Sequence, residues 1–359
     1  MVRGTAGRRP RRANIILIGL ATIVVLFSVC SMVIVKTMYD KQFQRADKPK
    51  FSGYLMYVDV DGYYDRRVVR FRSGDNTLVG YVYGERNDKG LVVIAHGLGG
   101  GAESYLAETQ YFVDNGWRVF SFDCTGSYES EGKGTKGLPQ SVVDLNSALG
   151  YIESDSALKD LPVMLYGHSW GGYAVAAVLN RDHDIAAAAS IAGFNAPMGI
   201  LFEQAKEMMG AFAYVEYPFM WAYQTMLFGR AARLTAVDGI NSADTAVMVI
   251  HGDKDKTVSY DSAGIIAHKS EITNPNVVYK TCTTENHNGH RNLFRSDAAA
   301  EYINQKNLEY RELYELYNGS IPDDVLADYY TNMDRTLASE LDTDFMDEIN
   351  RFFERRLPD

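Results

Sequence analysis

The stretch that decides the fold runs from Val163 to Leu179 and reads VMLYGHSWGGYAVAAVL. An apolar, strand-like start leads into Gly167-His168-Ser169-Trp170-Gly171, and a helix-prone segment follows. This is the pattern G-x-S-x-G in the order strand, sharp turn, helix, which projects a serine hydroxyl above the edge of a sheet. Glycine at 167 and 171 lets strand and helix pass closely, and the start of the helix aims backbone N–H groups at developing negative charge. Ser169 is therefore the candidate nucleophile.

Two other turns follow apolar runs. The turn HGLGGG, residues 96–101, comes directly after LVVIA and frees the backbone N–H of Leu98 to act with that of Trp170 as an oxyanion hole. A plain strand-to-helix turn that needs glycine is the alternative. The turn HGDKD, residues 251–255, follows AVMVI and supplies carboxylates. A histidine about 35 residues later completes the chain order Ser, Asp, His.

Apolar runs alternate with helix-like stretches through most of the chain. Continuous apolar runs are typical of strands covered on both faces and lie at 91–95, 117–122, 163–166, 185–191, 246–250 and 277–281. Helix-like stretches at 104–115, 138–154 and 172–179 separate them, and residues 68–83 contain a hairpin signal. The alternation predicts one domain of the α/β class, with a mostly parallel central sheet and helices on both faces.

Together these segments resemble the α/β-hydrolase family, close to the serine hydrolases that include monoacylglycerol lipase-like esterases and the serine aminopeptidase-type group. The resemblance covers roughly residues 65–357 and rests on SGDNTLVGYVYG, HGLGGG, FDCTGSYESEG, GHSWGG and HGDKD. It implies an α/β-hydrolase domain at 65–359, with a helical cap at 196–240 inserted between strands six and seven. It also implies Asp255 as the triad acid, while Asp253 and Asp123 organise turns.

Two histidines follow the last expected strand and are candidates for the base of the triad. The family presents Gly-His just before a helix, with an apolar residue a few positions on. Gly289-His290, followed by Leu293-Phe294, fits that form. His287 lacks the preceding glycine, so His290 is favoured and His287 is the alternative.

The resemblance implies a serine hydrolase that cleaves an ester, thioester or peptide acyl bond through an acyl-enzyme. Ser169 would attack the carbonyl, His290 would move the proton, and Asp255 would hold the imidazole, with the oxyanion on Leu98 and Trp170. This chemistry requires no metal or organic cofactor, and the expected partner is a small-molecule or lipid-like acyl substrate. The alternatives are a catalytically silent binding protein of this fold, or an acyltransferase or peptidase that uses the same triad.

The amino terminus predicts a membrane anchor. Residues 13–35 hold 23 residues without a charge, and as a helix they would span about 34 Å, enough to cross a hydrocarbon core of about 30 Å. Five arginines precede this run and place the amino terminus in the cytoplasm. A cleaved signal peptide and a buried core helix are the alternatives, but no small-x-small cleavage site follows. We expect a basic cytoplasmic tail at 1–12, a transmembrane helix at 13–35, a juxtamembrane segment at 36–64, and the catalytic domain outside the cell membrane.

Charge excludes one class of function. Residues 36–359 carry 31 basic and 46 acidic side chains. A body this acidic is a poor nucleic-acid binder, because phosphate contacts need clustered Lys and Arg.

The chain contains three cysteines, which are too few for a disulfide framework.

The segment Phe202–Phe228 is rich in aromatic residues and methionines, and Glu216 is the one charge between Met208 and Gly229. Three interpretations stay open: side chains that pack the cap onto the body, an apolar acyl pocket, or a cap that touches the membrane. The pocket interpretation predicts a preference for medium or long acyl groups. Near the carboxyl end, apolar residues recur at helical spacing from Phe345 to Leu357 and predict a packing helix.

Overall fold

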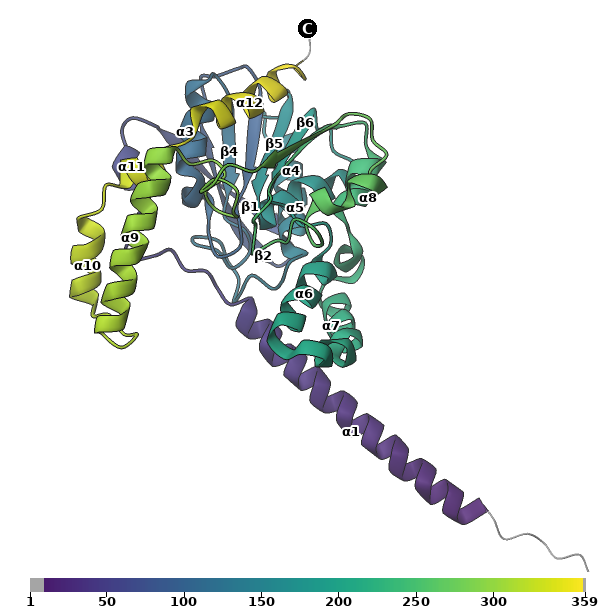
Figure 1. Ribbon diagram of the computed structural model, residues 1–359. Coiled ribbons are helices and arrows are strands. Elements are labelled where there is room, and N and C mark those ends of the chain that lie inside the picture. Colours follow the sequence, from purple (N-terminus) through teal and green to yellow (C-terminus); the bar gives the residue numbers. More distant parts are fainter. Residues whose placement is uncertain (1–9, 358–359) are drawn as a thin grey trace, which may run out of the picture.

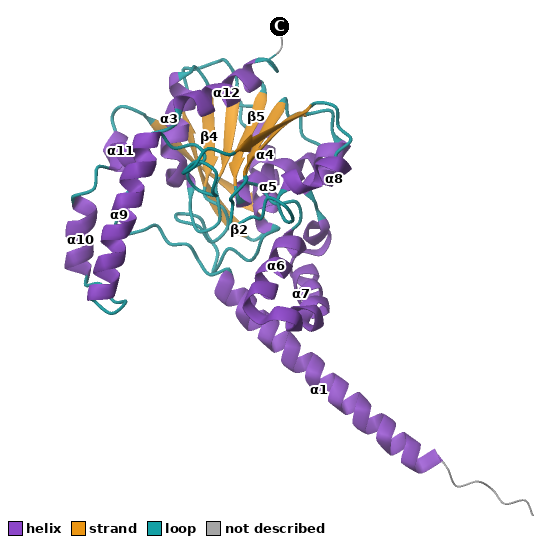
Figure 2. Ribbon diagram, in the orientation of Figure 1, coloured by secondary structure: helices purple, strands orange, loops and turns teal. Residues whose placement is uncertain are grey.

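The computed structural model describes residues 10–357, so residues 1–9 of the predicted basic tail lie outside the described residues. Eight strands form one sheet in the order β1-β2-β4-β3-β5-β6-β7-β8. The sheet is drawn in orange in Figure 2. β1 and β2 form the predicted antiparallel hairpin, β2 pairs antiparallel with β4, and every later pairing is parallel. The predicted mostly parallel sheet is confirmed. The strands are β1 Arg66–Ser73, β2 Asn76–Tyr83, β3 Leu91–Ala95, β4 Arg118–Phe122, β5 Val163–His168, β6 Ala187–Ile191, β7 Ala246–Gly252 and β8 Val277–Cys282.

Helices cover both faces of the sheet, as the continuous apolar strands predict (Figure 1). On β3, Leu91 and Val93 pack into a core with α4 Gln140–Ser154, α5 Trp170–Ala177 and α8 Ala236–Ser242. Val92 and Ile94 pack into a second core with α3 Leu106–Asp114 and α12 Thr343–Glu354. Successive side chains of a strand point to opposite faces, so a strand buried on both sides is apolar throughout. The predicted carboxyl-terminal packing helix is α12, whose apolar side chains are buried.

Two further helices form an arm beside the body (Figure 1). They are α9 Asp297–Leu316 and α10 Asp323–Thr331. α10 has no buried residue. The shorter helices are α2 Tyr57–Val60 and α11 Arg335–Ser339, together with the 3₁₀ turns Ala102–Tyr105, Val178–Asn180 and Ile265–Glu271.

The segment between β6 and β7 is helical, as predicted for a cap. It contains α6 Pro197–Met209, the 3₁₀ turn Gly210–Phe212, α7 Ala213–Phe228 and the 3₁₀ turn Gly229–Arg233. This helical segment lies beside the carboxyl-terminal half of the first helix (Figure 1).

The first helix, α1, runs from Pro10 to Gln42 and therefore contains the predicted membrane span, residues 13–35, and continues beyond it. Lys36 and Asp40 form an ion pair one turn apart, so the charged residues extend the helix instead of ending it. Val35, Tyr39 and Phe43 are buried in the core of the body. The chain after α1 is also held to the body, because the Arg45 guanidinium donates to the carbonyls of Ser130 and Gly132. The predicted juxtamembrane segment is therefore packed on the domain rather than free of it.

Candidate active site

Ser169 lies at the turn between β5 and α5, with φ 57° and ψ −114°. This strained backbone holds its side chain clear of the sheet edge. A Cβ at Gly171 would lie 1.9 Å from the carbonyl oxygen of Ala95, and one at Gly167 would lie 2.3 Å from that of Gly171. The two glycines therefore permit the close pass of strand and helix that the sequence predicts.

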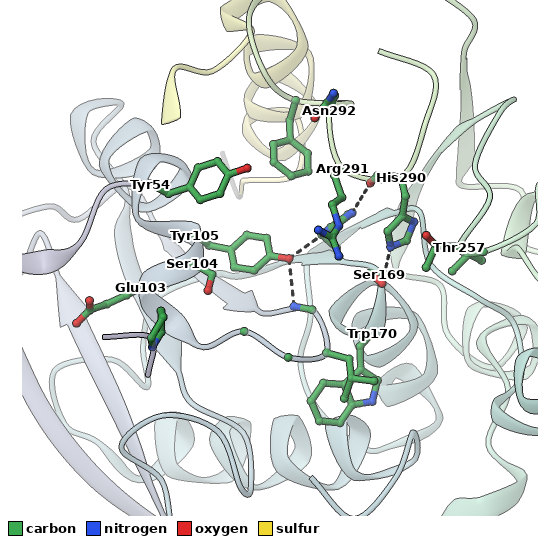
Figure 3. A pocket seen from close by; sticks show the side chains of 18 of the residues that line it. Tyr54, Glu103, Ser104, Tyr105, Ser169, Trp170, Thr257, His290, Arg291 and Asn292 are labelled. Atoms are coloured by element: carbon green, nitrogen blue, oxygen red, sulfur yellow. Dashed lines mark hydrogen bonds between the residues drawn. The ribbon is translucent and has the colours of Figure 1, made fainter. Parts of the chain in front are cut away.

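A chain of hydrogen bonds joins Ser169, His290 and Asp255. Figure 3 shows its bond between Ser169 and His290. His290 Nε2 lies 2.8 Å from Ser169 Oγ, and His290 Nδ1 lies 2.7 Å from Asp255 Oδ2. The other carboxylate oxygen of Asp255 accepts the backbone N–H groups of Thr257 at 2.8 Å and Val258 at 2.9 Å. Both oxygens of the carboxylate are thus fixed, and the imidazole is held between acid and hydroxyl.

Asp255 is the ionised member of this chain. Burial alone would raise the pKa of its carboxyl group, but hydrogen bonds from His251 and His290 outweigh burial and hold that pKa well below its usual range. A carboxylate that stays charged favours the imidazole tautomer with its proton on Nδ1, which leaves Nε2 free to accept the Ser169 proton.

His287, the alternative histidine, lies away from the serine. Its Nε2 is 2.8 Å from Asp297 Oδ1, and its Nδ1 is 3.1 Å from the carbonyl oxygen of Asn292. Asp253 is likewise engaged elsewhere and accepts the side-chain amide of Asn288 at 2.9 Å. The structure therefore brings Ser169, Asp255 and His290 together and keeps His287 and Asp253 apart from them.

The two expected oxyanion donors border the serine. Leu98 follows β3 in a turn that approaches the elbow, since a Cβ built on Gly97 would lie 3.7 Å from the Cβ of Ser169. The Leu98 N–H has no hydrogen-bond acceptor within the described residues. Trp170 occupies the first position of α5, where a helix supplies no acceptor for its own N–H groups. Both amides are therefore available to a carbonyl oxygen placed at Ser169.

Tyr105, labelled in Figure 3, and His168 form a second network near the serine, which the sequence did not predict. The Tyr105 hydroxyl accepts the N–H of Gly97 at 3.1 Å and lies 2.8 Å from His168 Nδ1. His168 Nε2 lies 2.8 Å from the carbonyl oxygen of His290. Burial and the neighbouring His290 lower the pKa of His168 to about 3, so its ring is neutral. A neutral ring that donates from Nε2 and accepts from Tyr105 at Nδ1 joins the oxyanion turn, the elbow and the His290 loop.

A cavity of about 520 Å³ opens at Ser169 and His290. Its wall includes Gln42 at the end of α1, Ile200 and Gln204 of α6, and six residues from the segment after α1: Lys48, Pro49, Ser52, Tyr54, Leu55 and Met56. Of the described residues that line it, only Gln204 comes from the segment Phe202–Phe228. The aromatic and methionine side chains of that segment therefore do not line this cavity; Phe219, Met220 and Phe228 pack against the apolar core, and Met226 is exposed.

Asp123 has the structural role predicted for it. Its carboxylate accepts the backbone N–H of Ala102 at 2.7 Å and that of Glu129 at 3.2 Å, together with the Tyr81 hydroxyl at 3.1 Å. It therefore ties the loop after β4 to the oxyanion turn and to the hairpin.

Sheet order, elbow, cap position and the Ser–His–Asp arrangement together define an α/β-hydrolase fold, as the sequence predicts. Residues 86–215 match the family described as serine aminopeptidase, S33. The quorum-quenching protein AidA of Acinetobacter baumannii (strain MDR-ZJ06) is 30% identical over 132 residues, which are 34% of this chain and 42% of that protein. The chain thus matches less than half the length of this relative.

Solved structures share the fold. One crystal form of the Pyrococcus furiosus esterase Pf2001 aligns with a TM-score of 0.53 at 15% identity, over 75% of this chain and 95% of that chain. A second crystal form of the same esterase aligns with a TM-score of 0.52 at 18% identity, over 68% of this chain and 91% of that chain. The family match and the fold support a hydrolytic enzyme.

Proposed function

We propose that the protein is a serine hydrolase of acyl substrates, with Ser169 as nucleophile, His290 as general base and acid, and Asp255 as the residue that orients the imidazole. The observation that carries the proposal is His290, hydrogen-bonded to Ser169 on one nitrogen and to Asp255 on the other. A silent binding protein of this fold would have no need for this arrangement beside an open cavity.

In the proposed reaction Ser169 Oγ attacks the acyl carbonyl carbon while His290 Nε2 takes the hydroxyl proton. The carbonyl oxygen becomes an oxyanion held by the N–H groups of Leu98 and Trp170, each worth about 3 kcal/mol in the transition state. The intermediate collapses to an acyl-enzyme as His290 returns the proton to the leaving group. A water molecule, activated by the same imidazole, then releases the acid and restores Ser169.

Esters and thioesters are the favoured substrates over peptides with a free amino terminus. An aminopeptidase needs a carboxylate for the substrate ammonium group, and Glu103 is the one carboxylate among the described residues that line the cavity. It is already paired with Lys48 at 2.7 Å and faces Arg66 at 3.5 Å. The match to the serine aminopeptidase family keeps peptidase activity as the second candidate.

Parallel assays separate the two candidates. Wild-type protein and Ser169→Ala are given a p-nitrophenyl ester and an aminoacyl p-nitroanilide of matched acyl size. We expect ester turnover that Ser169→Ala abolishes, with at least tenfold lower kcat/KM for the anilide. Faster turnover of the anilide would assign the aminopeptidase function. Turnover that survives in Ser169→Ala would remove the proposed mechanism.

We also propose that α1 anchors the enzyme as a single-pass membrane helix, with the catalytic domain outside the cytoplasm. Within Asn14–Gln42 an 18-residue window has mean hydropathy 2.7, and the helix is long enough to cross a membrane; a signal sequence has the same character. Most of its apolar side chains from Ile15 to Val29 are exposed, whereas a core helix would bury them. The arginines before residue 13 support a cytoplasmic amino terminus.

A further inference from the structure

The cap helix α7 buries polar side chains and exposes apolar ones, which is the reverse of a helix that faces water. Its two long polar side chains, Glu216 and Gln224, are only 1% and 0% exposed and point toward the rest of the protein. Its outer side carries large apolar side chains, and Met226 is 71% exposed. We call this outer side the cap face: Tyr214, Val215, Tyr217, Trp221, Met226 and Leu227. A helix in water shows the reverse pattern, whereas a helix in lipid turns its ionisable residues toward protein.

α7 packs across the apolar part of α1. The rings of Phe27 and Phe219 lie 5.9 Å apart, and Ser31 Oγ donates to Glu216 Oε1 at 2.9 Å. Further along α1, the Tyr39 ring lies 5.2 Å from that of Tyr223. α7 therefore lies at the level of residues 27–39 of α1, and the lower part of that range is within the predicted span.

Helix length shows where the bilayer must reach. If α7 lay wholly in water, only residues 13–26 of α1 would remain for the hydrocarbon core, and these 14 residues rise about 21 Å. The core is about 30 Å thick, and Arg11 and Arg12 prevent an extension at the other end. About 9 Å of hydrocarbon must therefore surround the level of α7, which is the depth at which interfacial helices insert.

The edge of the cap is suited to the lipid headgroup region. The Arg233 guanidinium lies 5.1 Å from the centre of the Trp221 ring, and long cations and tryptophan are the side chains that occupy membrane interfaces. The cavity at Ser169 reaches this side of the molecule, because Gln42 of α1 and Ile200 and Gln204 of α6 line part of its wall.

We propose that the cap face inserts among the acyl chains of the outer leaflet, and that the substrate is an acyl ester resident in the bilayer, which reaches Ser169 past Gln42, Ile200 and Gln204. The proposal that the cap inserts depends on the proposed membrane anchor, and the proposal of a bilayer substrate depends on the proposed hydrolase function.

Tryptophan fluorescence tests insertion without any hydrolysis. Trp117 and Trp170 are buried, so Trp221 is the tryptophan that lipid can reach. In full-length protein in phosphatidylcholine vesicles, lipids with brominated acyl chains should quench wild-type emission, and Trp221→Phe should lose the quenched component. Val68→Trp in the Trp221→Phe background adds an exposed tryptophan on the edge strand β1 and should not be quenched. Equal quenching of wild type and Trp221→Phe would overturn the insertion.

The route of the substrate has its own test. Met226→Lys places a charge on the cap face away from Ser169, and Val68→Lys is the matched control on β1. For Met226→Lys we expect at least a tenfold loss of kcat/KM toward a long-chain ester embedded in vesicles and unchanged turnover of a water-soluble short-chain ester. Val68→Lys should change neither. Unchanged or equally lowered activity toward both esters in Met226→Lys would contradict the bilayer route. A wild type that hydrolyses neither ester would remove the hydrolase proposal, while the quenching result would still stand.

Discussion

At the scale of single residues, His290 and His287 offer the sharpest contrast, because they are three positions apart with different partners. His290→Ala should lower kcat by several orders of magnitude, since members of a triad act as a unit. His287→Ala should cost about tenfold or less, because it loses a contact to the exposed Asp297. Steady-state ester hydrolysis by both variants measures this. The opposite ranking would give the catalytic role to His287.

The buried ring of His168 predicts how stability depends on pH. Its pKa is about 3 in the folded protein, whereas an unfolded histidine titrates near 6.5. Between these values only the unfolded chain takes up the proton. The neutral ring of His168 therefore makes its full contribution to the free energy of unfolding above about pH 6.5. That free energy falls as the pH is lowered, by about 1.4 kcal/mol per pH unit.

Urea unfolding of wild type and His168→Gln at pH 7, 6 and 5 isolates this contribution, because glutamine does not titrate. The free-energy difference between the two proteins should narrow below pH 6.5 at about the rate given above. A difference that stays constant with pH would mean that His168 takes up its proton in the folded state as well.

Which site residues the sequence could predict depends on whether a local motif holds them. Ser169 and Asp255 lie in short turns after apolar strands, so their positions could be predicted, and the structure places both beside His290. The two histidines His290 and His287 lie in the same loop, and only the folded path of that loop shows which of them contacts Ser169. Tyr105 could not be found, because its hydrogen bond to His168 joins residues 63 positions apart and no motif contains it.

At the scale of helices and strands, the sequence pattern predicted the elements correctly where their side chains are completely buried. Doubly covered strands such as β3 are apolar throughout and were predicted almost to the residue. α10 was not predicted; it is short and acidic, and none of its side chains is fully buried. α1 continues to Gln42, beyond the predicted membrane span, because its charged last turns are stabilised by contacts with the cap that the sequence does not reveal.

The packing of α1 on α7 predicts what removal of α1 should do to the rest of the chain. Removal of residues 1–38 takes away the partners of Phe219 and Glu216, and Val35 with them. We expect the truncated chain to aggregate or to need detergent, as size-exclusion chromatography with and without detergent would show. The same truncation with Trp221→Glu and Met226→Glu should stay dispersed better, because the cap face is then polar. A monodisperse truncated chain in plain buffer would mean that α1 is only a tether.

At the scale of the whole molecule, topology decides which compartment the active site faces. The proposed topology, which rests on the arginines before residue 13, predicts that protease added to intact cells or right-side-out vesicles digests the body. An amino-terminal epitope should survive until the membrane is permeabilised, which serves as the control. A body that stays intact until permeabilisation would reverse the topology.

The central claim is that Ser169 is an activated nucleophile in an otherwise folded hydrolase. Labelling with a fluorophosphonate probe, followed by mass spectrometry of the labelled peptide, tests it most directly. Full-length wild type should carry one adduct on Ser169, Ser169→Ala should carry none, and His290→Ala should label far more slowly. Folded wild type that takes no label, or label that persists in Ser169→Ala, would contradict the claim.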